Sequence, residues 1–144
     1  LWEKLVLTSA FGGVGAATGL AQGQMMQDER ASTMLEQAIH EVVKLANLRG
    51  IGLDRETAAR TMAFVAQFPG TARTTMHRDI EARRPSEYPV LTGGVLAMAR
   101  EIGLSLPIHE EIDRMIRQRG LNPEDGHALE AAEHISSLIK HLPG

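Results

Sequence analysis

The sequence contains no cysteine, which excludes disulfides, thiolate nucleophiles and cysteine-ligated zinc sites. No apolar run approaches the roughly 20 residues that a membrane-spanning helix needs. Aromatic residues make up only 3% of the chain, whereas methionine occurs 7 times, so we expect an aliphatic, methionine-filled core. The formal net charge of -3 gives no basic surface for nucleic acid. We therefore expect no membrane span and no nucleic-acid partner.

The length of 144 residues is enough for one domain with a real core and too short for a two-domain enzyme. The chain begins "LWEK", without methionine and already in mid-pattern, so we expect it to be a fragment of a longer protein. A charged-then-apolar leader is missing as well, and the expected location is the cytoplasm.

Helical periodicity dominates the pattern of apolar residues. From Asp28 to Arg49 they recur at helical spacing, with Asp28 placed to cap the first turn and Gly50 to end the last. Further helices are predicted over 54–68, 71–84, 87–103, 107–119 and 123–142. No segment shows the alternation of a strand. The sequence thus predicts one all-α domain, 1–144, of six to seven helices in a bundle-like arrangement.

The opening stretch "KLVLTSAFGGVGAATG" (4–19) allows two interpretations. It is close to the glycine-rich turn on which short-chain dehydrogenases rest a pyrophosphate at a helix N-terminus. However, Ser9 stands where the first glycine should be, and no second strand or acidic strand end follows. The only tyrosine, Tyr88, also lacks the lysine four residues later that such enzymes use. A helix with small residues for close packing is favoured, and the nucleotide-binding segment stays the weaker alternative.

Read as a helix, the opening places Lys4, Thr8 and Gly12 on one face, because they are spaced four residues apart. Trp2 and Leu5 flank Lys4, so we expect its ammonium to be partly withdrawn from water.

The segments "LWEKL" and "TTMHRDIEARRPSEYPVLTGGVLAMAREIGLSLPIHEEI" together resemble the C-terminal domain of ketopantoate reductases (2-dehydropantoate 2-reductases), within the 6-phosphogluconate-dehydrogenase-like oxidoreductases. The family's helix with a catalytic lysine matches the first segment. The family's later motifs match in order and spacing, and the whole match runs from residue 1 to about 117. These motifs are Thr75-Met76 with Asp79, Ser86-Glu87, Gly94, and Gly103 to Pro107.

The resemblance implies that a Rossmann domain holding NADPH precedes this chain in the complete protein. The chain itself would then be the helical domain that binds substrate and mediates dimerisation, with a homodimer expected. The complete protein would reduce ketopantoate, or a related small 2-keto acid, to the 2-hydroxy acid; with ketopantoate this is a step of pantothenate biosynthesis. The isolated segment would be inactive.

Carried over by position, Lys4 matches the catalytic acid, which donates a proton to the alkoxide that forms on reduction. Glu87 matches the substrate-binding glutamate, and Thr75 the hydroxyl that binds the substrate carboxylate. The family has asparagines where this chain has Thr8 and Gly12. Thr8 keeps a polar group toward substrate, whereas Gly12 marks a lost contact, which leaves the substrate's identity open.

Each assignment has a structural alternative. Lys4 could be an ordinary lysine at a helix start, and Glu87 a first-turn glutamate favoured by the helix dipole. Asp79 is expected to pair with Arg83, one helical turn on. The whole chain could also be a non-catalytic interaction or dimerisation domain that keeps the fold.

The three tail histidines are spaced by seven residues, too far apart to share one metal ion easily, so we expect a solvated face and no metal site: His127, His134 and His141.

Overall fold

The structure is a computed structural model, and it describes residues 1–124. This part of the chain contains helices and no strand, which confirms the predicted all-α class. The helices are α1 (Trp2–Thr18), α2 (Gln22–Gln27), α3 (Glu29–Leu48), α4 (Thr57–Ala66), α5 (Thr75–Glu81), α6 (Thr92–Glu101) and α7 (Pro107–Gln118). The predicted helix over 123–142 lies outside the described residues, as do the three tail histidines.

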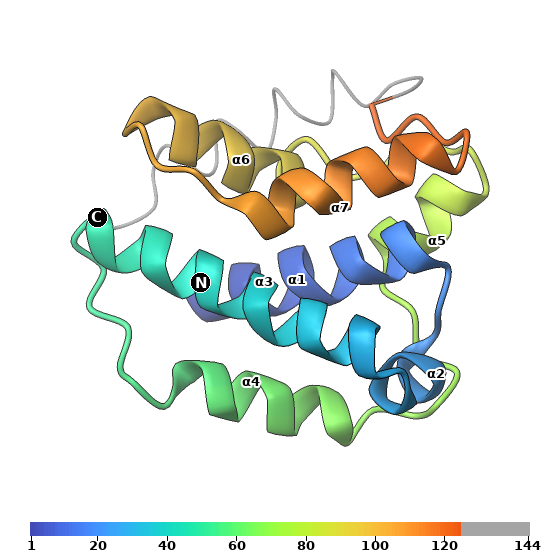
Figure 1. Ribbon diagram of the computed structural model, residues 1–144, viewed down its shortest axis with the longest axis horizontal. Coiled ribbons are helices and arrows are strands. Elements are labelled where there is room, and N and C mark those ends of the chain that lie inside the picture. The colour runs from blue at the N-terminus through green and yellow to red at the C-terminus, as the bar shows by residue number, and fades with distance from the viewer. Residues whose placement is uncertain (125–144) are drawn as a thin grey trace.

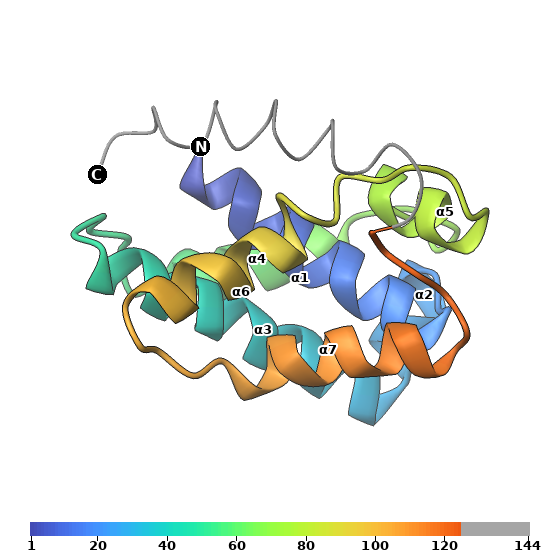
Figure 2. The ribbon, with the colours of Figure 1, turned by 90° about the horizontal axis from the view of Figure 1, so that it is seen from above.

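Helix α1 forms the centre of the molecule. It runs beside α3 in a middle layer, with α6 and α7 on one side and α4 on the other (Figure 1). The short helices α2 and α5 lie together at the end where α1 finishes (Figures 1 and 2). Because α1 contacts α3, α4, α5, α6 and α7, its residues are buried on almost every side.

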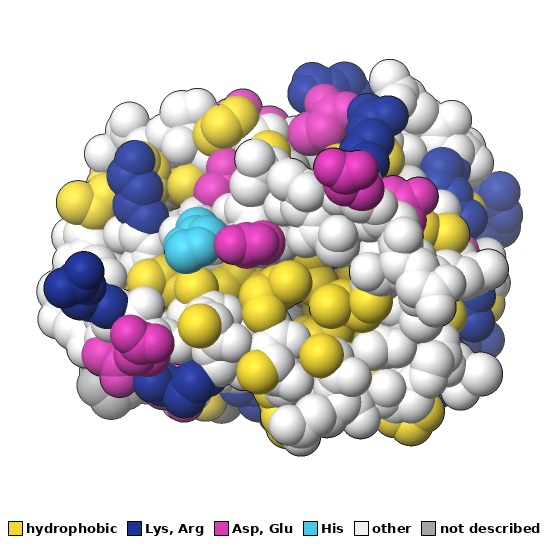
Figure 3. Space-filling model, turned by 60° about the horizontal axis from the view of Figure 1, so that its bottom comes forward, with side chains coloured by type: hydrophobic (Ala, Val, Ile, Leu, Met, Phe, Trp, Pro, Cys, Tyr) yellow, Lys and Arg dark blue, Asp and Glu magenta, His cyan; other side chains and the backbone are white. Residues whose placement is uncertain are grey.

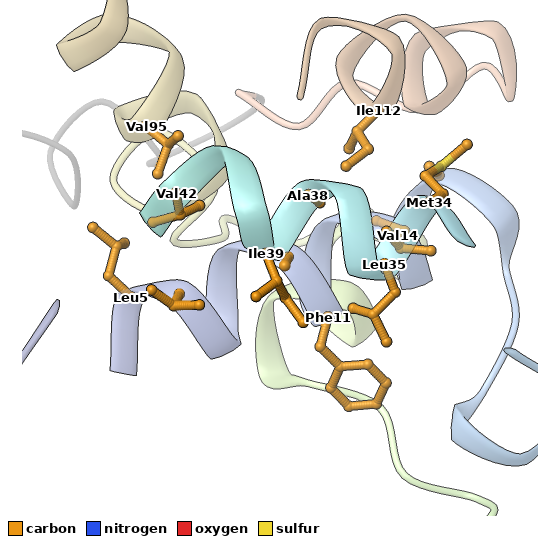
Figure 4. Packing of buried hydrophobic residues seen from close by; sticks show 14 of the residues in the cluster. Leu5, Phe11, Val14, Met34, Leu35, Ala38, Ile39, Val42, Val95 and Ile112 are labelled. Atoms are coloured by element: carbon orange, nitrogen blue, oxygen red, sulfur yellow. The ribbon is translucent and has the colours of Figure 1, made fainter. Parts of the chain in front are cut away.

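The core is built mainly between α1 and α3. Leu5 and Val14 of α1 lie against Leu35, Ile39 and Val42 of α3 (Figure 4). Val95 of α6 and Ile112 of α7 close the same cluster from above. All but Leu5 are fully buried, and burial of each such side chain stabilises the fold by about 1.5–3 kcal/mol. This packing holds α1 rigidly in place.

Several predicted helix boundaries are confirmed. The Asp28 carboxylate accepts a hydrogen bond of 2.8 Å from the Ala31 backbone N–H and so caps α3. Pro107 is the first residue of α7, where its missing N–H leaves no hydrogen bond unmade. Gly50 follows α3 in the left-handed region at φ 86°, which ends the helix.

The predicted start of α6 is wrong by five residues. Ser86 caps no helix; its hydroxyl accepts a hydrogen bond from the Tyr88 N–H within a turn. The Glu87 carbonyl then receives the N–H groups of Val90 and Leu91, and α6 begins only at Thr92. Glu87 therefore lies in a loop, which excludes the interpretation of Glu87 as a first-turn glutamate.

The helix predicted over 71–84 is present but shorter, since α5 covers only the middle half of the segment. The expected pairing of Asp79 with Arg83 is also wrong. Asp79 pairs with Arg84 at 3.0 Å, because Arg83 adopts a left-handed φ of 59° and turns its guanidinium to the Gly120 carbonyl. Helix α2, six residues long, was not predicted at all.

The face of the molecule that includes α4 carries a band of hydrophobic side chains, with charged side chains along its rim (Figure 3). Phe64 of α4 contributes to the exposed hydrophobic surface, with 51% of its surface accessible. None of the described helices is both long and apolar enough to cross a membrane.

Candidate functional site

The candidate site begins with the face of α1 that carries Lys4, Thr8 and Gly12. We name this face the stripe of α1. Lys4 is exposed and Thr8 half-buried. The expected shielding of Lys4 by its neighbours is wrong for this chain, because Trp2 and Leu5 are buried on another side of the helix. The Thr8 hydroxyl donates its hydrogen to the Lys4 carbonyl at 2.8 Å. In this arrangement Thr8 presents a hydrogen-bond acceptor, and no donor, to a ligand.

Gly12 is buried beneath the start of α5. A Cβ at this position would lie 2.8 Å from the Thr74 hydroxyl oxygen and 2.9 Å from the Met76 methyl group. Both distances are shorter than van der Waals contact, so α5 can approach α1 this closely only because residue 12 is glycine. The Thr74 hydroxyl thus occupies the space that a side chain at position 12 would fill.

The neighbouring glycines of α1 serve close packing as well. A Cβ at Gly13 would lie 3.0 Å from the Thr92 hydroxyl oxygen, and a Cβ at Gly15 would lie 2.5 Å from His77 Nδ1. These glycines are inside a buried helix, so they form no phosphate-binding loop. The helical interpretation of the opening stretch is confirmed, and the nucleotide-binding segment is excluded.

Thr75 is the first residue of α5 and is exposed. Thr74 caps the helix by accepting the His77 N–H at 3.1 Å, and this cap fixes the backbone beside Gly12. The Arg78 guanidinium lies one turn on and donates to the Thr75 hydroxyl at 3.4 Å. The side chains that lie against Gly12 belong to Thr74 and Met76, so the backbone of Thr75 between them lies beside α1 at the level of Gly12, about 12 Å along the helix from Lys4.

Glu87 is exposed in the loop before α6, and buried neighbours hold this loop in place. The Tyr88 hydroxyl donates to Asp113 of α7, and burial raises the pKa of Tyr88 well above its usual range. At the start of α6, the Thr92 hydroxyl donates to the Ser9 carbonyl of α1 at 3.0 Å. No hydrogen bond or ion pair joins Glu87 to Lys4 within residues 1–124.

A cavity of about 560 Å³ opens between the first turns of α1 and one face of α4. We name it the α1–α4 cavity. Its lining residues are Glu3, Lys4, Leu7, Thr57, Arg60, Thr61, Ala63, Phe64 and Gln67. Lys4 thus belongs both to this cavity and to the stripe that leads to Thr75.

A buried network of hydrogen bonds joins α1, α3 and α7 at the centre of the molecule. The sequence pattern did not predict it. The Ser9 hydroxyl lies 3.0 Å from His109 Nε2, and His109 Nδ1 lies 2.7 Å from the Glu41 carboxylate. Glu41 also accepts the backbone N–H groups of Ile108 and His109 at 2.8 Å, so it caps α7. Ser9 and His109 are fully buried, so no substrate can reach them and the network is structural.

A second buried histidine, His77, lies under α1. Burial lowers its pKa below the ordinary value of 6.5, and the Glu81 carboxylate opposes this shift. His77 Nε2 lies 3.0 Å from a Glu81 oxygen, but the two groups are too poorly aligned for a good hydrogen bond. Within residues 1–124 no group of three or more acidic or histidine side chains lies close enough to hold a metal ion.

Residues 1–120 match the family described as "Ketopantoate reductase PanE/ApbA C terminal". The chain belongs to the ketopantoate reductase family. A 2-dehydropantoate 2-reductase of Nostoc sp. is 28% identical over 106 residues, which cover 74% of this chain and 33% of the relative. That of Mycobacterium tuberculosis is 28% identical over 109 residues, covering 76% of this chain and 36% of the relative. The chain therefore spans about a third of the length of these relatives.

Solved structures share the fold of this ketopantoate reductase domain. A dimeric ketopantoate reductase from Staphylococcus aureus superposes with a TM-score of 0.74 at 21% identity, over 81% of this chain and 41% of that one. A complex of D-mandelate dehydrogenase with NADH superposes with a TM-score of 0.70 at 18% identity, over 84% and 50% of the two chains. The helical architecture is thus that of a C-terminal domain in a family of oxidoreductases.

Proposed function

We propose that this chain is the substrate-binding domain of a nicotinamide-dependent reductase that converts ketopantoate, or a related small 2-keto acid, to the 2-hydroxy acid. The observation that carries the proposal is the single face of α1 that leads from the exposed Lys4 ammonium, past Thr8, to Thr75 at the start of α5. A 2-keto acid needs a proton donor at its carbonyl oxygen and hydrogen-bond donors at its carboxylate. This face offers both.

Lys4 is the proposed proton donor. Its ammonium polarises the ketone and protonates the alkoxide oxygen, and the charge is held close to where the negative charge develops. The Thr75 hydroxyl is proposed to donate to the substrate carboxylate. Thr8 is proposed to accept a hydrogen bond from a substrate hydroxyl, since its own hydrogen is already donated to Lys4. Glu87 is proposed to bind a hydroxyl of the substrate or the Lys4 ammonium.

The cofactor is proposed to be NADPH, held mainly by an N-terminal Rossmann domain outside this chain. The glycines of α1 do not fit a pyrophosphate, because they are buried in helix packing and leave no backbone N–H groups free to receive it. When bound to the complete protein, the cofactor would supply the hydride. What this chain contributes is the binding, orientation and protonation of the keto acid, in the cytoplasm.

The test uses the complete protein, including the residues that precede Leu1. We expect NADPH oxidation with ketopantoate or another 2-keto acid from a panel, and a loss of kcat of at least about a hundredfold in Lys4→Ala, the range for loss of a general acid. Lys44→Ala is the matched control, because Lys44 is an exposed lysine on α3 outside the site. Turnover that survives Lys4→Ala would contradict the role of Lys4.

The alternative is a non-catalytic domain that keeps the fold. Two observations favour it: Thr8 offers no donor to a ligand, and Gly12 is covered by Thr74. Absence of turnover with every keto acid would support this alternative.

We also propose that the complete protein is a homodimer, as the Staphylococcus aureus relative is described to be. Analytical ultracentrifugation of the complete protein tests this, and a monomer at micromolar concentration would contradict it.

A further inference from the structure

Lys4 lies between two different surfaces of the molecule. Leu7 and Thr8 follow it by three and four residues, so at 100° per residue they point to opposite sides of it. Leu7 lines the α1–α4 cavity, whereas Thr8 belongs to the stripe that leads toward Thr75. A ligand whose central atom is held at Lys4 can therefore extend one group into the cavity and another along the stripe.

The exposed lining of the cavity is mainly apolar. Most of its polar side chains already have hydrogen-bond or ion-pair partners. Arg60 donates to both carboxylate oxygens of Asp54, at 3.1 and 3.3 Å, and lies 3.7 Å from Glu3. The Thr61 hydroxyl donates to the Thr57 carbonyl at 2.8 Å. Lys4 is left as the one lining cation without an ion-pair partner among residues 1–124. Its ammonium lies at the edge of an apolar wall.

That wall contains an aromatic ring fixed in position. The chain has three phenylalanines, and all of them stack in one row. Phe11 of the core contacts Phe68 at a centroid distance of 5.6 Å, and Phe68 contacts Phe64 edge-on at 5.0 Å. Phe64 ends the row in the cavity, with half its surface exposed. The edge-on contact supports one side of the ring, and an exposed aromatic surface is what an apolar ligand group packs against.

We infer that the α1–α4 cavity binds the side chain of the 2-keto acid, and that the preferred substrates carry a bulky apolar side chain, branched or aromatic. The inference rests on the proposed function. The carbonyl carbon of a 2-keto acid carries only two further groups, the carboxylate and the side chain. With the carbonyl oxygen at Lys4 and the carboxylate on the side of Thr75, the side chain points into the cavity, where Leu7 and Phe64 set its size.

The test compares phenylpyruvate with pyruvate as substrates of the complete protein. We expect kcat/KM to be higher for phenylpyruvate. Ala63→Leu takes up part of the cavity and should lower the ratio of kcat/KM for phenylpyruvate to kcat/KM for pyruvate at least about tenfold, the scale of a lost fit in an apolar pocket. Phe64→Ala should lower it about fivefold through the lost ring contact.

Ala59→Leu is the matched control, because Ala59 is exposed on the same helix but does not line the cavity. It should keep the wild-type ratio. A wild-type preference for pyruvate, or equal effects of the two leucine substitutions, would overturn the inference. The proposed function would still stand in either case if Lys4→Ala abolished turnover. If the wild type turned over no keto acid at all, both would fall.

Discussion

At the scale of single residues, the two positions where the resemblance implies asparagine, Thr8 and Gly12, differ in kind. Thr8 is half-buried. Gly12 is buried, and the Thr74 hydroxyl lies where its Cβ would be. At the first, the hydroxyl bonds within its own helix. The second is a condition for the contact between α1 and α5.

We therefore expect asparagine to be tolerated at position 8 and not at position 12. Gly12→Asn should lower the free energy of unfolding by about 2 kcal/mol or more, since overpacking of this size outweighs the helix propensity gained from removing glycine. Thr8→Asn should change it by less than about 0.5 kcal/mol, as is usual away from packed positions. Urea denaturation of the chain measures both. Equal effects would show that α5 can move aside.

His77 makes the free energy of unfolding of the chain depend on pH. Burial lowers its pKa in the folded state, so between the ordinary and the lowered value the unfolded chain binds more protons. The contribution of His77 to stability is therefore present above about pH 6.5 and is lost as the pH falls through the pKa of His77 in the folded state.

His77→Gln should make the free energy of unfolding fall less between pH 7 and pH 5, as measured by denaturation at each pH. His40→Gln, at an exposed histidine of α3, is the matched control for the substitution itself. A parallel fall in wild type and His77→Gln would contradict the assignment of His77.

At the scale of secondary-structure elements, the Glu41 carboxylate connects α3 to the first turn of α7. It accepts two backbone N–H groups and the His109 ring, and through that ring it reaches Ser9 of α1. Three helices that are far apart in the sequence thus share one buried set of hydrogen bonds. Such sets are costly to break, because each partner left behind is buried without water.

Glu41→Gln should lower the free energy of unfolding by about 2 kcal/mol, the scale of lost hydrogen bonds to a charged group. Glu36→Gln on the same helix should be nearly neutral, because Glu36 is exposed and its ion pair with the exposed His40 is long at 4.0 Å. Thermal and urea denaturation of the two variants under the same conditions give the comparison. If both variants were neutral, the carboxylate would not be needed as the cap of α7.

The long helices could be predicted from the sequence because their signals are local. The apolar stripe and Asp28 cap define α3, and Pro107 defines the start of α7. The start of α6 could not be predicted, because Ser86 followed by glutamate also occurs in the turn that Tyr88 closes. The network of Ser9 and His109 joins residues 100 positions apart, which no local pattern contains.

At the scale of the whole molecule, Lys4 is exposed on its face of α1, and the glycines of that helix are buried in packing and form no phosphate-binding loop. We therefore expect the isolated 144-residue chain to fold yet to show neither NADPH binding nor turnover. Isothermal titration with NADPH and an assay with 2-keto acids measure this, with the complete protein as the positive control. Binding of NADPH by the isolated chain would contradict the proposed division between the two domains.

The candidate site was predicted at this scale only as a resemblance. Lys4, Thr8 and Gly12 share a face because helical spacing dictates it, and the start of α5, with Thr74 and Met76, packs against Gly12 at the end of that face. The cavity beside Lys4 could not be foreseen, because α4 reaches it from 50 residues further along the chain.

The central position of α1 also has a consequence for synthesis. This helix packs on α3, α5, α6 and α7, and its Ser9 meets a partner 100 residues later. At about 5–20 residues per second, translation supplies that partner roughly 5–20 s after Ser9 has been made. During this interval the small and apolar surface of α1 is uncovered on most sides. The nascent chain is therefore a candidate for chaperone binding at its first helix, and the domain completes its fold only after α7 has left the ribosome.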